Sequence, residues 1–271
     1  MSTNTPEIIA ESNLSHAWGR VFLHAMDRGA ANLAPLMVSI TGFVDGVPTE
    51  DEPIRSSLDR ILASQPKKFS CKISASTIFP YEVWLRRGRP SVSPFSTLYL
   101  TQFLPRLRAR DRHNGHGTYF ERMVSFHGSK LLKGQCEHVT KNQLEHVISI
   151  WRRDRAVGRS SRHSALQITV FDPAKDHSGA ALLGFPCLQQ VSLSYDGHDG
   201  LAVSAFYPTQ YIVDRAYGNY LGLCHLGCFL AHEMSMKMVR LNCFIGLPEL
   251  GQGWTKNQLR GLADLIRSRF P

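Results

Sequence analysis

The chain has 271 residues, enough for one large domain or two small ones, and 43% of them are hydrophobic, so a sizeable core can be buried. No run of about 18 apolar residues is present, so we expect no membrane span. The formal charge of +9 and the pI near 9.4 favour an anionic partner such as a phosphorylated small molecule or a nucleic acid.

The first half of the chain gives mixed patterns. Residues 1–12 are polar, lack the features of a secretory signal and are expected to be a flexible tail of a cytosolic protein. Helical spacing predicts helices over residues 18–26, behind Ser15 as the N-cap, and over residues 54–62. Alternation predicts a strand over residues 36–40.

Two further stretches of this half are predicted to lack helices and strands. Residues 80–105 hold four prolines and much serine, so they are expected to be irregular. Asn114, Gly115 and Gly117 predict a turn.

The second half has a clearer order. An amphipathic helix is predicted over residues 143–151, and the arginine-rich residues 152–162 are expected to be a loop. A strand follows over residues 165–171, a β-hairpin over residues 191–207 and a buried helix over residues 216–234.

The chain closes on one more predicted helix, for which Thr255 and Gln258 provide a capping box. Helices and strands are mixed, with hairpins instead of regular βαβ alternation, and no break in composition divides the chain. The sequence therefore predicts one α+β domain spanning residues 1–271.

The excess positive charge is concentrated in three stretches, at Arg86, Arg87 and Arg89, at residues 106–112 and at residues 152–162. Three interpretations stay open: solvated loops and helix ends, a phosphate site, or a nucleic-acid surface. The six cysteines form no CxxC pair and are expected to be free thiols.

Cys187 has a distinctive context. It lies in the segment 184–190, Gly-Phe-Pro-Cys-Leu-Gln-Gln, directly before a predicted strand. Pro186 restricts the backbone there, so the cysteine would be held rigidly. Such a cysteine is a nucleophile if nearby cations lower its pKa, and otherwise a structural thiol.

Residues 143–245 resemble the core of the thymidylate synthases. That family's order is an amphipathic helix, an Arg-Arg pair, a strand, a Pro-Cys nucleophile, a hairpin, an Arg-Ser pair and an Asn that opens a long buried helix. Here Arg162 and His163 stand at the first pair, Cys187 at the nucleophile and Asn219 at the helix start, 32 residues after Cys187. The Cys-Leu-Gln tripeptide resembles the pyrimidine hydroxymethylase branch of the superfamily.

The resemblance implies a thymidylate-synthase-like fold and a one-carbon transferase, either a methyl or a hydroxymethyl transferase. Cys187 would add to C6 of a pyrimidine nucleotide, and C5 would then take a one-carbon unit from methylenetetrahydrofolate. Asn219 matches the residue that reads the pyrimidine edge, and its amide suits uracil O4 and N3–H; the alternative role is a helix N-cap. The family also implies a homodimer with a sheet-to-sheet interface.

Other site residues follow from the same resemblance. Arg162, with His163 in the second place, matches the arginines that reach a phosphate across the dimer interface; a solvated loop is the alternative. Tyr119 and Glu82 match the catalytic tyrosine and the general acid/base of the family. Core packing and a surface charge are their alternative roles.

Several family positions are altered. Pro208 stands where the family has its main phosphate arginine, Thr209 matches the adjoining serine, and Asp214 lies close to the place of a substrate-binding aspartate but out of register. The His-x-Tyr pair on the ribose and the C-terminal tail over the folate are not recognisable. Arg155, Arg159 or Arg215 would then have to replace the phosphate arginine. A non-catalytic relative that binds a nucleotide or serves in an assembly is the alternative function.

A metal site is the remaining alternative. Cys224, Cys228 and His232 are spaced four residues apart, on one face of the predicted buried helix, and zinc accepts such ligands. Thiols on a buried helix are also ordinary core residues, so no metal is expected.

Overall fold

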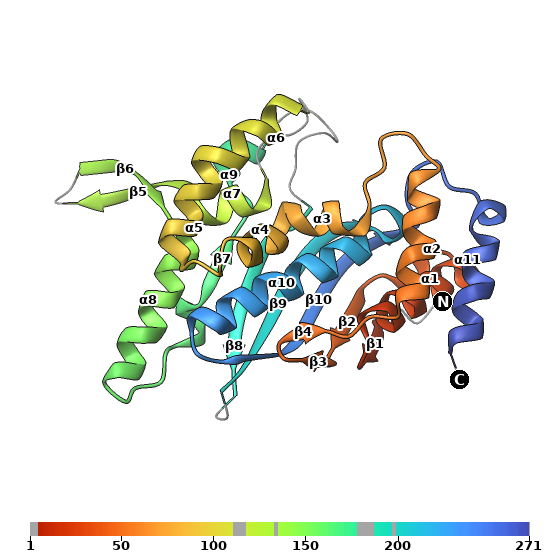
Figure 1. Ribbon diagram of the computed structural model, residues 1–271, viewed down its shortest axis with the longest axis horizontal. Coiled ribbons are helices and arrows are strands. Elements are labelled where there is room, and N and C mark those ends of the chain that lie inside the picture. Colours follow the sequence, from red (N-terminus) through yellow and green to blue (C-terminus); the bar gives the residue numbers. More distant parts are fainter. Residues whose placement is uncertain (1–4, 111–117, 133–134, 178–186, 197–198, 271) are drawn as a thin grey trace.

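The computed structural model describes residues 5–110, 118–132, 135–177, 187–196 and 199–270 (Figure 1). Its side chains are described in the same ranges, apart from residue 110 and residues 129–138. Asn114, Gly115, Gly117 and Pro186, to which the sequence drew attention, lie outside the described residues.

A six-stranded mixed sheet forms the centre of the molecule and confirms the predicted α+β class. In spatial order its strands are β1 (Glu7–Glu11), β2 (Leu36–Ile40), β10 (Lys237–Glu249), β9 (Gly200–Tyr211), β8 (Gln190–Tyr195) and β7 (Gln167–Thr169). The pairs β1–β2 and β10–β9 are parallel, and the others are antiparallel.

One long helix, α10 (Tyr217–Glu233), covers one face of this sheet (Figure 1). It connects the parallel strands β9 and β10, as such a pair requires a crossover connection. A short π-helical segment, η5 (Ile212–Ala216), leads into it. Nearly every residue of α10 is buried, because helices lie on its other sides as well.

Helix α3 (Cys71–Ile78) packs very closely against α10. The close approach depends on glycine, since a Cβ atom at Gly222 would lie 2.7 Å from the Ala75 carbonyl oxygen. A Cβ atom at Gly218 would lie 2.4 Å from that of Ser74. Both glycines therefore allow the backbones of α10 and α3 to approach each other closely.

The remaining helices gather at the two ends of the sheet (Figure 1). One end holds α1 (Leu14–Arg28), α2 (Glu52–Ala63) and α11 (Lys256–Arg269), with η1 (Ala30–Leu33) and the small hairpin β3 (Phe43–Val44) and β4 (Val47–Pro48) nearby. The elements that follow α3 along the chain are α4 (Tyr81–Arg86), α5 (Val92–Leu98), η2 (Tyr99–Phe103), α6 (Leu104–Arg110), α7 (Tyr119–Val124), the hairpin β5 (Phe126–Leu132) and β6 (Gln135–Lys141), α8 (Gln143–Ala156), η4 (His163–Ala165) and α9 (Pro173–Asp176). No helix among the described residues is long and apolar enough to cross a membrane.

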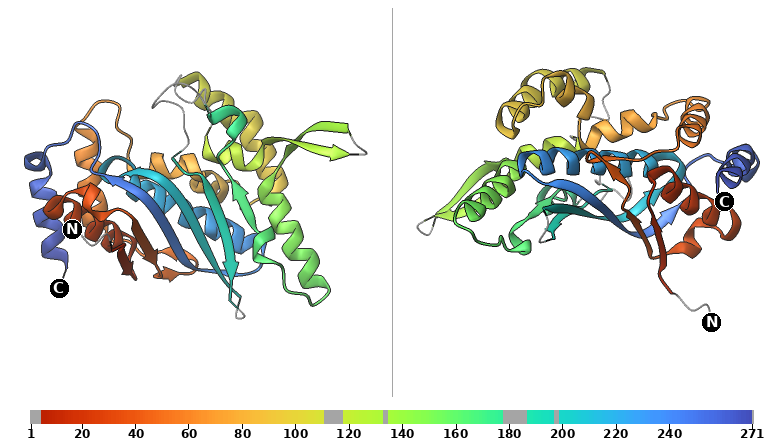
Figure 2. Two further views of the ribbon diagram at one scale, coloured as in Figure 1. Left: turned by 180° about the vertical axis from the view of Figure 1, so that it is seen from behind. Right: turned by 60° about the horizontal axis from the view of Figure 1, so that its bottom comes forward.

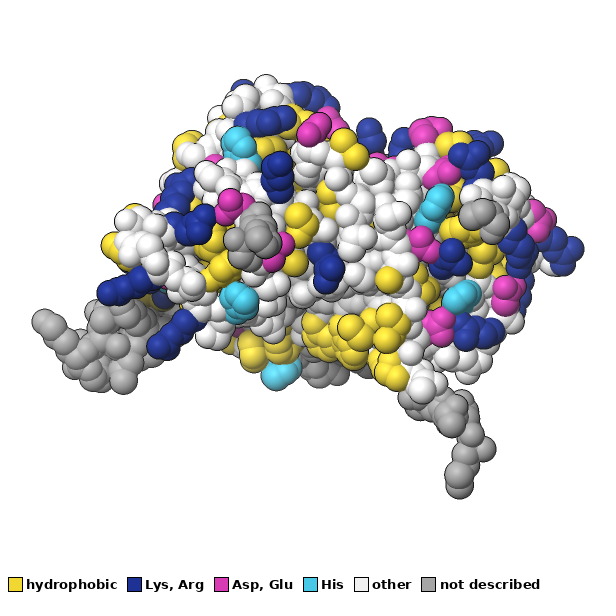
Figure 3. Space-filling model, turned by 90° about the horizontal axis from the view of Figure 1, so that it is seen from below, with side chains coloured by type: hydrophobic (Ala, Val, Ile, Leu, Met, Phe, Trp, Pro, Cys, Tyr) yellow, Lys and Arg dark blue, Asp and Glu magenta, His cyan; other side chains and the backbone are white. Residues whose placement is uncertain are grey.

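The opposite face of the sheet carries no helix of the described chain (Figure 2, left). A row of apolar side chains crosses it in register from β1 to β9, where Ile8 pairs with Met37, Met37 with Phe244, and Phe244 with Phe206. These four side chains are 40–67% exposed. Figure 3 shows hydrophobic side chains gathered on this underside of the molecule, while Lys and Arg side chains are scattered around them.

Many of the predicted elements are confirmed. The helices α2 and α10, the strand β2, the hairpin β8–β9 and the capping box of α11 lie where the sequence patterns put them. Leu166, Ile168 and Val170 alternate into the core as expected. The strand they belong to is shorter than predicted, because only Gln167–Thr169 pairs with β8.

Four predictions were wrong. Residues 80–105 are largely helical, and two of their prolines stand where a helix needs no N–H donor: Pro80 is the N-cap of α4, and Pro94 lies in the first turn of α5. Residues 7–11 form β1 instead of a tail, since they hydrogen-bond to β2. The N-cap of α1 is Asn13, which accepts from the Ser15 and His16 N–H groups. Helix α8 continues to Ala156, so residues 152–156 are not a loop.

Candidate functional site around Cys187

Cys187 lies at the entry to β8, beside strand β9. The N–H of Gln189 donates to the Phe206 carbonyl over 3.0 Å, which ties the segment to β9 two residues after the cysteine. Leu188 is completely buried and anchors the chain in the core, whereas Cys187 itself is exposed. The thiol is therefore fixed by the backbone and still accessible.

Tyr119 approaches this thiol from another part of the chain. It is the first residue of α7, whose N-cap Thr118 accepts a hydrogen bond from the Glu121 N–H over 3.1 Å. The Tyr119 hydroxyl lies within hydrogen-bonding reach of the Cys187 thiol, and the N–H groups of Cys187 and Leu188 are also directed to its oxygen. Burial, together with the nearby Cys187 sulfur, raises the pKa of Tyr119, so the phenol stays protonated and able to donate.

Arg215 is the described cation that acts on both of these groups, and it comes from η5 at the start of α10. Its guanidinium lies 5.1 Å from the centre of the Phe69 ring, and it forms no ion pair with any described carboxylate. Asn219 follows four residues later, so it lies on the same side of the helix. The residue is 5% exposed, and its amide forms no hydrogen bond with a described residue.

The electrostatics of the thiol differ from expectation. Although the residue is exposed to solvent on one side, desolvation by the protein atoms around its sulfur raises the pKa of Cys187, and neither the positive charge of Arg215 nor the hydrogen bond of Tyr119 offsets this. The carboxylate of Glu249 raises this pKa further. None of the arginines among residues 152–162 is among the charges that act on the thiol.

Two buried polar atoms of β9 have no hydrogen-bond partner among the described residues. They are the hydroxyl of Tyr207, a fully buried residue, and Nε2 of Gln210, which is 2% exposed. The Gln210 carbonyl accepts from the Tyr220 hydroxyl over 3.0 Å, so the amide nitrogen is the free end. Tyr207 interacts electrostatically with Tyr119 and with Cys187, which places it in the same site. Buried polar groups without a partner are unusual in proteins, and a bound water, ion or ligand can satisfy them.

Sequence reasoning missed Tyr207, Gln210 and Glu249. Tyr207 continues an alternating apolar strand, so the pattern predicts only a core residue. The one signal in the sequence was Gln210, a glutamine in a strand whose other residues point alternately into the core.

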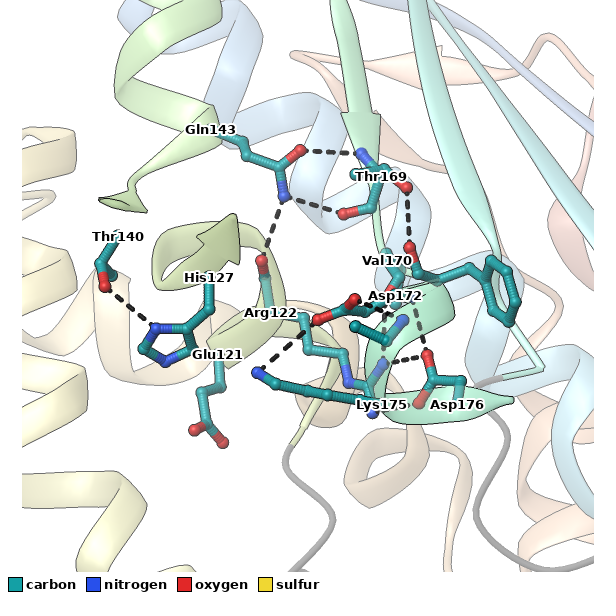
Figure 4. A network of polar contacts seen from close by, with 12 residues as sticks. Glu121, Arg122, His127, Thr140, Gln143, Thr169, Val170, Asp172, Lys175 and Asp176 are labelled. Atoms are coloured by element: carbon teal, nitrogen blue, oxygen red, sulfur yellow. Dashed lines mark hydrogen bonds and ion pairs between the residues drawn. The ribbon is translucent and has the colours of Figure 1, made fainter. Parts of the chain in front are cut away.

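A buried ion pair holds α7, and with it Tyr119, against α9 (Figure 4). Nη1 of Arg122 donates to Asp176 Oδ2 over 2.5 Å and Nη2 donates to Oδ1 over 2.8 Å. The Asp172 N–H donates to the same carboxylate over 2.8 Å, and Arg122 also donates to the Val170 carbonyl over 3.1 Å. Asp176 is 4% exposed, so this clamp is almost fully desolvated.

Gln143 continues the network of Figure 4 from α7 to the sheet. Its Nε2 donates to the carbonyls of Arg122 and Thr169 over 3.1 and 2.8 Å, and its Oε1 accepts from the Thr169 N–H over 2.9 Å. Helices α7 and α8 and strand β7 are thus connected through one side chain.

The predicted phosphate residues are far from Cys187 in the same chain. His163 packs on the ring of Tyr195, 4.8 Å between centroids, and the Tyr195 hydroxyl donates to the Ser161 carbonyl. Tyr195 ends β8 and Cys187 precedes it, so the two ends are about 25 Å apart at 3.3 Å per residue. Arg162 is exposed at the Tyr195 end.

The other predicted site residues have distinct surroundings. Glu82 is exposed on α4 beside Tyr81, whose ring stacks on His225 at 4.2 Å, and it is not among the charges that act on the thiol. Thr209 lies on β9, three residues after Phe206, and pairs with Leu247 of β10.

Asp214 is already bound by protein groups. Its carboxylate accepts from Lys68 Nζ over 2.7 Å, from Trp254 Nε1 over 2.5 Å and from the Gln252 N–H over 3.2 Å. The contacts with Trp254 and Gln252 hold the segment after β10 against η5. The structure therefore brings Cys187 and Tyr119 together and leaves Asp214 in a structural contact.

The zinc alternative gains no support from the described residues. Cys224 and Cys228 are buried, and no group of three or more His, Cys, Asp or Glu side chains there is arranged to hold a metal.

Comparison with known protein families finds no matching family model. Comparison with curated proteins finds no match either.

Proposed function

We propose that the chain is a thymidylate-synthase-like one-carbon transferase that acts at C5 of a pyrimidine nucleotide through a covalent adduct with Cys187. The observation that carries this proposal is the meeting of Cys187, Tyr119 and Arg215 from three separate segments of the chain. The amide of Asn219, one turn beyond Arg215, forms no hydrogen bond with a described residue, which supports a role in reading the pyrimidine edge.

The reaction begins when the Cys187 thiolate forms a bond to C6 of the ring. The electron pair of the C5–C6 double bond moves onto C5 and O4, and C5 then attacks a one-carbon electrophile. Loss of the C5 proton and cleavage of the S–C6 bond restore the ring and release the thiolate. Arg215 favours the thiolate electrostatically, and the Tyr119 phenol donates a hydrogen bond to it.

Methylenetetrahydrofolate is the one-carbon donor that the family resemblance implies. The described C-terminal residues do not fit a folate site. The end of α11 packs on α1 instead of covering Cys187, with the Phe270 ring 5.1 Å from that of His16. No step is therefore derived through folate, and its use is a matter for experiment.

The proposal includes a homodimer formed through the uncovered sheet face. An exposed apolar row across four strands is unusual on a monomer and typical of an interface. Beside it runs a polar row in register, in which Ser39 donates to Asn242 over 3.0 Å and Asn242 to Ser204 over 3.3 Å. Because Arg162 lies at the far end of β8, it can meet the nucleotide phosphate only from a second copy.

The test is trapping with a fluorinated pyrimidine. Incubation with 5-fluorouridine or 5-fluorodeoxyuridine monophosphate, each with and without methylenetetrahydrofolate, should give an adduct on the Cys187 peptide by mass spectrometry. Cys187→Ser should abolish it, and Arg215→Ala should slow its formation, while the thermal melts of both stay within a few degrees of the wild type. A wild-type protein without any adduct under all four conditions contradicts the covalent mechanism.

A non-catalytic nucleotide-binding relative is the second candidate. Two features favour it. The raised pKa of Cys187 weakens the thiol as a nucleophile, and the proline at position 208 weakens the phosphate site. This candidate predicts saturable nucleotide binding without adduct formation. Calorimetry on the same protein separates the two functions.

A further inference from the structure

A pocket of about 290 Å³ lies between the hairpin β5–β6, the first turn of α8 and strand β7. The hairpin contributes Phe126, Gly128, Val139 and Lys141 to its lining. The antiparallel register places Phe126 opposite Lys141 and the other two opposite each other, so all four belong to one face of the hairpin. Phe126 and Val139 are half-buried, and a Cβ atom on Gly128 would meet no described atom within 4 Å. Apolar side chains therefore stand beside a space that no described side chain fills.

Strand β7 presents its free edge to this pocket. It is the last strand of the six-stranded sheet, so only one of its sides pairs with a neighbour, β8. The Leu166 carbonyl accepts from the Leu193 N–H over 3.0 Å, and residues of an antiparallel ladder alternate between bonded and non-bonded positions. Gln167, which lines the pocket, and Thr169 therefore direct their backbone N–H and C=O groups away from β8.

The side-chain amide of Gln143 already occupies one half of this edge (Figure 4). It accepts from the Thr169 N–H over 2.9 Å and donates to the Thr169 carbonyl over 2.8 Å, as one residue of a neighbouring strand would do. The outward N–H and C=O of Gln167 have no such partner among the described residues. One backbone donor and one acceptor are thus open at the pocket, roughly 7 Å along the strand from the Gln143 amide.

The pocket also carries unpaired positive charge. Lys141 of the hairpin and His146 of α8 line it, both are exposed, and neither side chain forms a hydrogen bond or an ion pair with a described residue. No Asp or Glu is found among the described residues of the lining. The formal charge of +9 of the whole chain acts in the same direction. An anionic partner is therefore complementary to this wall.

We propose that this pocket binds an extended, acidic peptide segment of a partner protein, which adds to the free edge of β7. One peptide residue exchanges two backbone hydrogen bonds with Gln167, as Gln143 does with Thr169. An adjacent apolar side chain enters the space beside Gly128, and a carboxylate of the peptide meets Lys141. Backbone pairing provides affinity in this mode of recognition, and the pocket provides the selection of side chains. No described residue of the lining belongs to the Cys187 site, so peptide binding does not depend on the proposed reaction.

Fluorescence polarisation with dye-labelled pentapeptides is the test. The probes carry Val, Leu, Ile or Phe at the centre and Asp or Glu at the flanking positions. At least one of them should bind the wild-type protein saturably below millimolar concentration, and the same peptide with Lys at the flanking positions should not. The amide that donates to Gln167 is found by methylating each peptide nitrogen in turn. Its methylation should weaken binding about two- to tenfold, because one backbone hydrogen bond is lost.

Two variants of the protein test the pocket itself. Gly128→Leu fills the space, and a side chain is tolerated there because Gly128 lies outside the left-handed region of the backbone. Binding should weaken roughly 10- to 150-fold, since the apolar side chain of the peptide loses its place. Lys141→Gln should weaken binding about two- to fivefold, as expected for an exposed ion pair. Gly261→Leu is the matched control, because Gly261 of α11 also has open space around it, and it should bind as the wild type does.

Several results overturn the inference. Absence of saturable binding by every acidic probe excludes this class of ligand. Equal binding of the acidic and the lysine probes removes the role of charge, and unchanged binding by Gly128→Leu with a wild-type thermal melt removes the role of the pocket. Self-association of the wild-type protein that Gly128→Leu abolishes assigns the pocket to a second copy of the chain instead. If Gly128→Leu does not fold, Lys141→Gln and the methylated probes still decide the question.

Discussion

Replacing Arg122 by methionine should destabilise the protein far more than the loss of an ordinary surface arginine. The substitution keeps most of the side-chain length but removes both charge-assisted hydrogen bonds to Asp176, which the structure gives at 2.5 and 2.8 Å. The carboxylate, 4% exposed, is then left with the Asp172 N–H as its remaining close donor. Breaking a buried pair from one side costs about 3–5 kcal/mol, because the other charge stays buried without compensation.

The measurement is urea unfolding at pH 7, followed by tryptophan fluorescence. At 2–4 °C per kcal/mol, the same loss lowers Tm by roughly 6–20 °C. Arg108→Met is the matched control, since Arg108 also binds α7, through Glu121 at 2.7 Å, but its side chain is 46% exposed. Arg108→Met should lower the free energy of unfolding by about 1 kcal/mol or less. Equal losses in the two variants would refute the argument from burial.

Three further outcomes follow from the same structure. Burial of Asp176 opposes its ionisation, but the Arg122 hydrogen bonds outweigh this and its pKa lies below the usual value, so its contribution is present at neutral pH and is lost as pH falls. The stability difference between the wild type and Asp176→Asn, measured by urea unfolding at several pH values, should therefore shrink below about pH 5. Gly222→Ala should cost about 1–3 kcal/mol in the same assay, because its Cβ would meet the Ala75 carbonyl oxygen at 2.7 Å, whereas Gly261→Ala, with open space around it, should stabilise by about 0.5–1 kcal/mol. Phe244→Asp should convert a dimer into a monomer by light scattering, while Val157→Asp, at an apolar position 62% exposed directly after α8, should not; a wild-type monomer at micromolar concentration would remove the model in which two copies share the site.

Local patterns were enough to find the elements whose burial is periodic. Helix α10 is apolar all round and β9 alternates, so each could be located from its own residues. The capping box of α11 depends on two residues three positions apart, and it was found for the same reason. The helices within residues 80–105 were missed. A high proline content suggests loops unless it is known that a proline lies at the start of a helix, where it is tolerated.

The candidate site was predictable only in part. Cys187 and Tyr119 were selected through family resemblance, and the structure brings them together. Arg215 was one of three arginines named as replacements for the phosphate arginine, and nothing in the sequence distinguished it from Arg155, which is paired with Asp199. The distinction depends on which segment leads into α10, and this is a property of the fold.

By itself, the sequence determined the α+β class and the order of the main elements in the second half of the chain. Tertiary structure decided the direction of the Cys187 pKa shift. The desolvation of the thiol and its interactions with Arg215 and Glu249 depend on segments that are far apart in the sequence and meet only in the fold. It also decided which sheet face lies bare and which buried polar atoms lack a partner. Periodicity tells which residues are apolar on one side of an element, but only packing tells what stands opposite them.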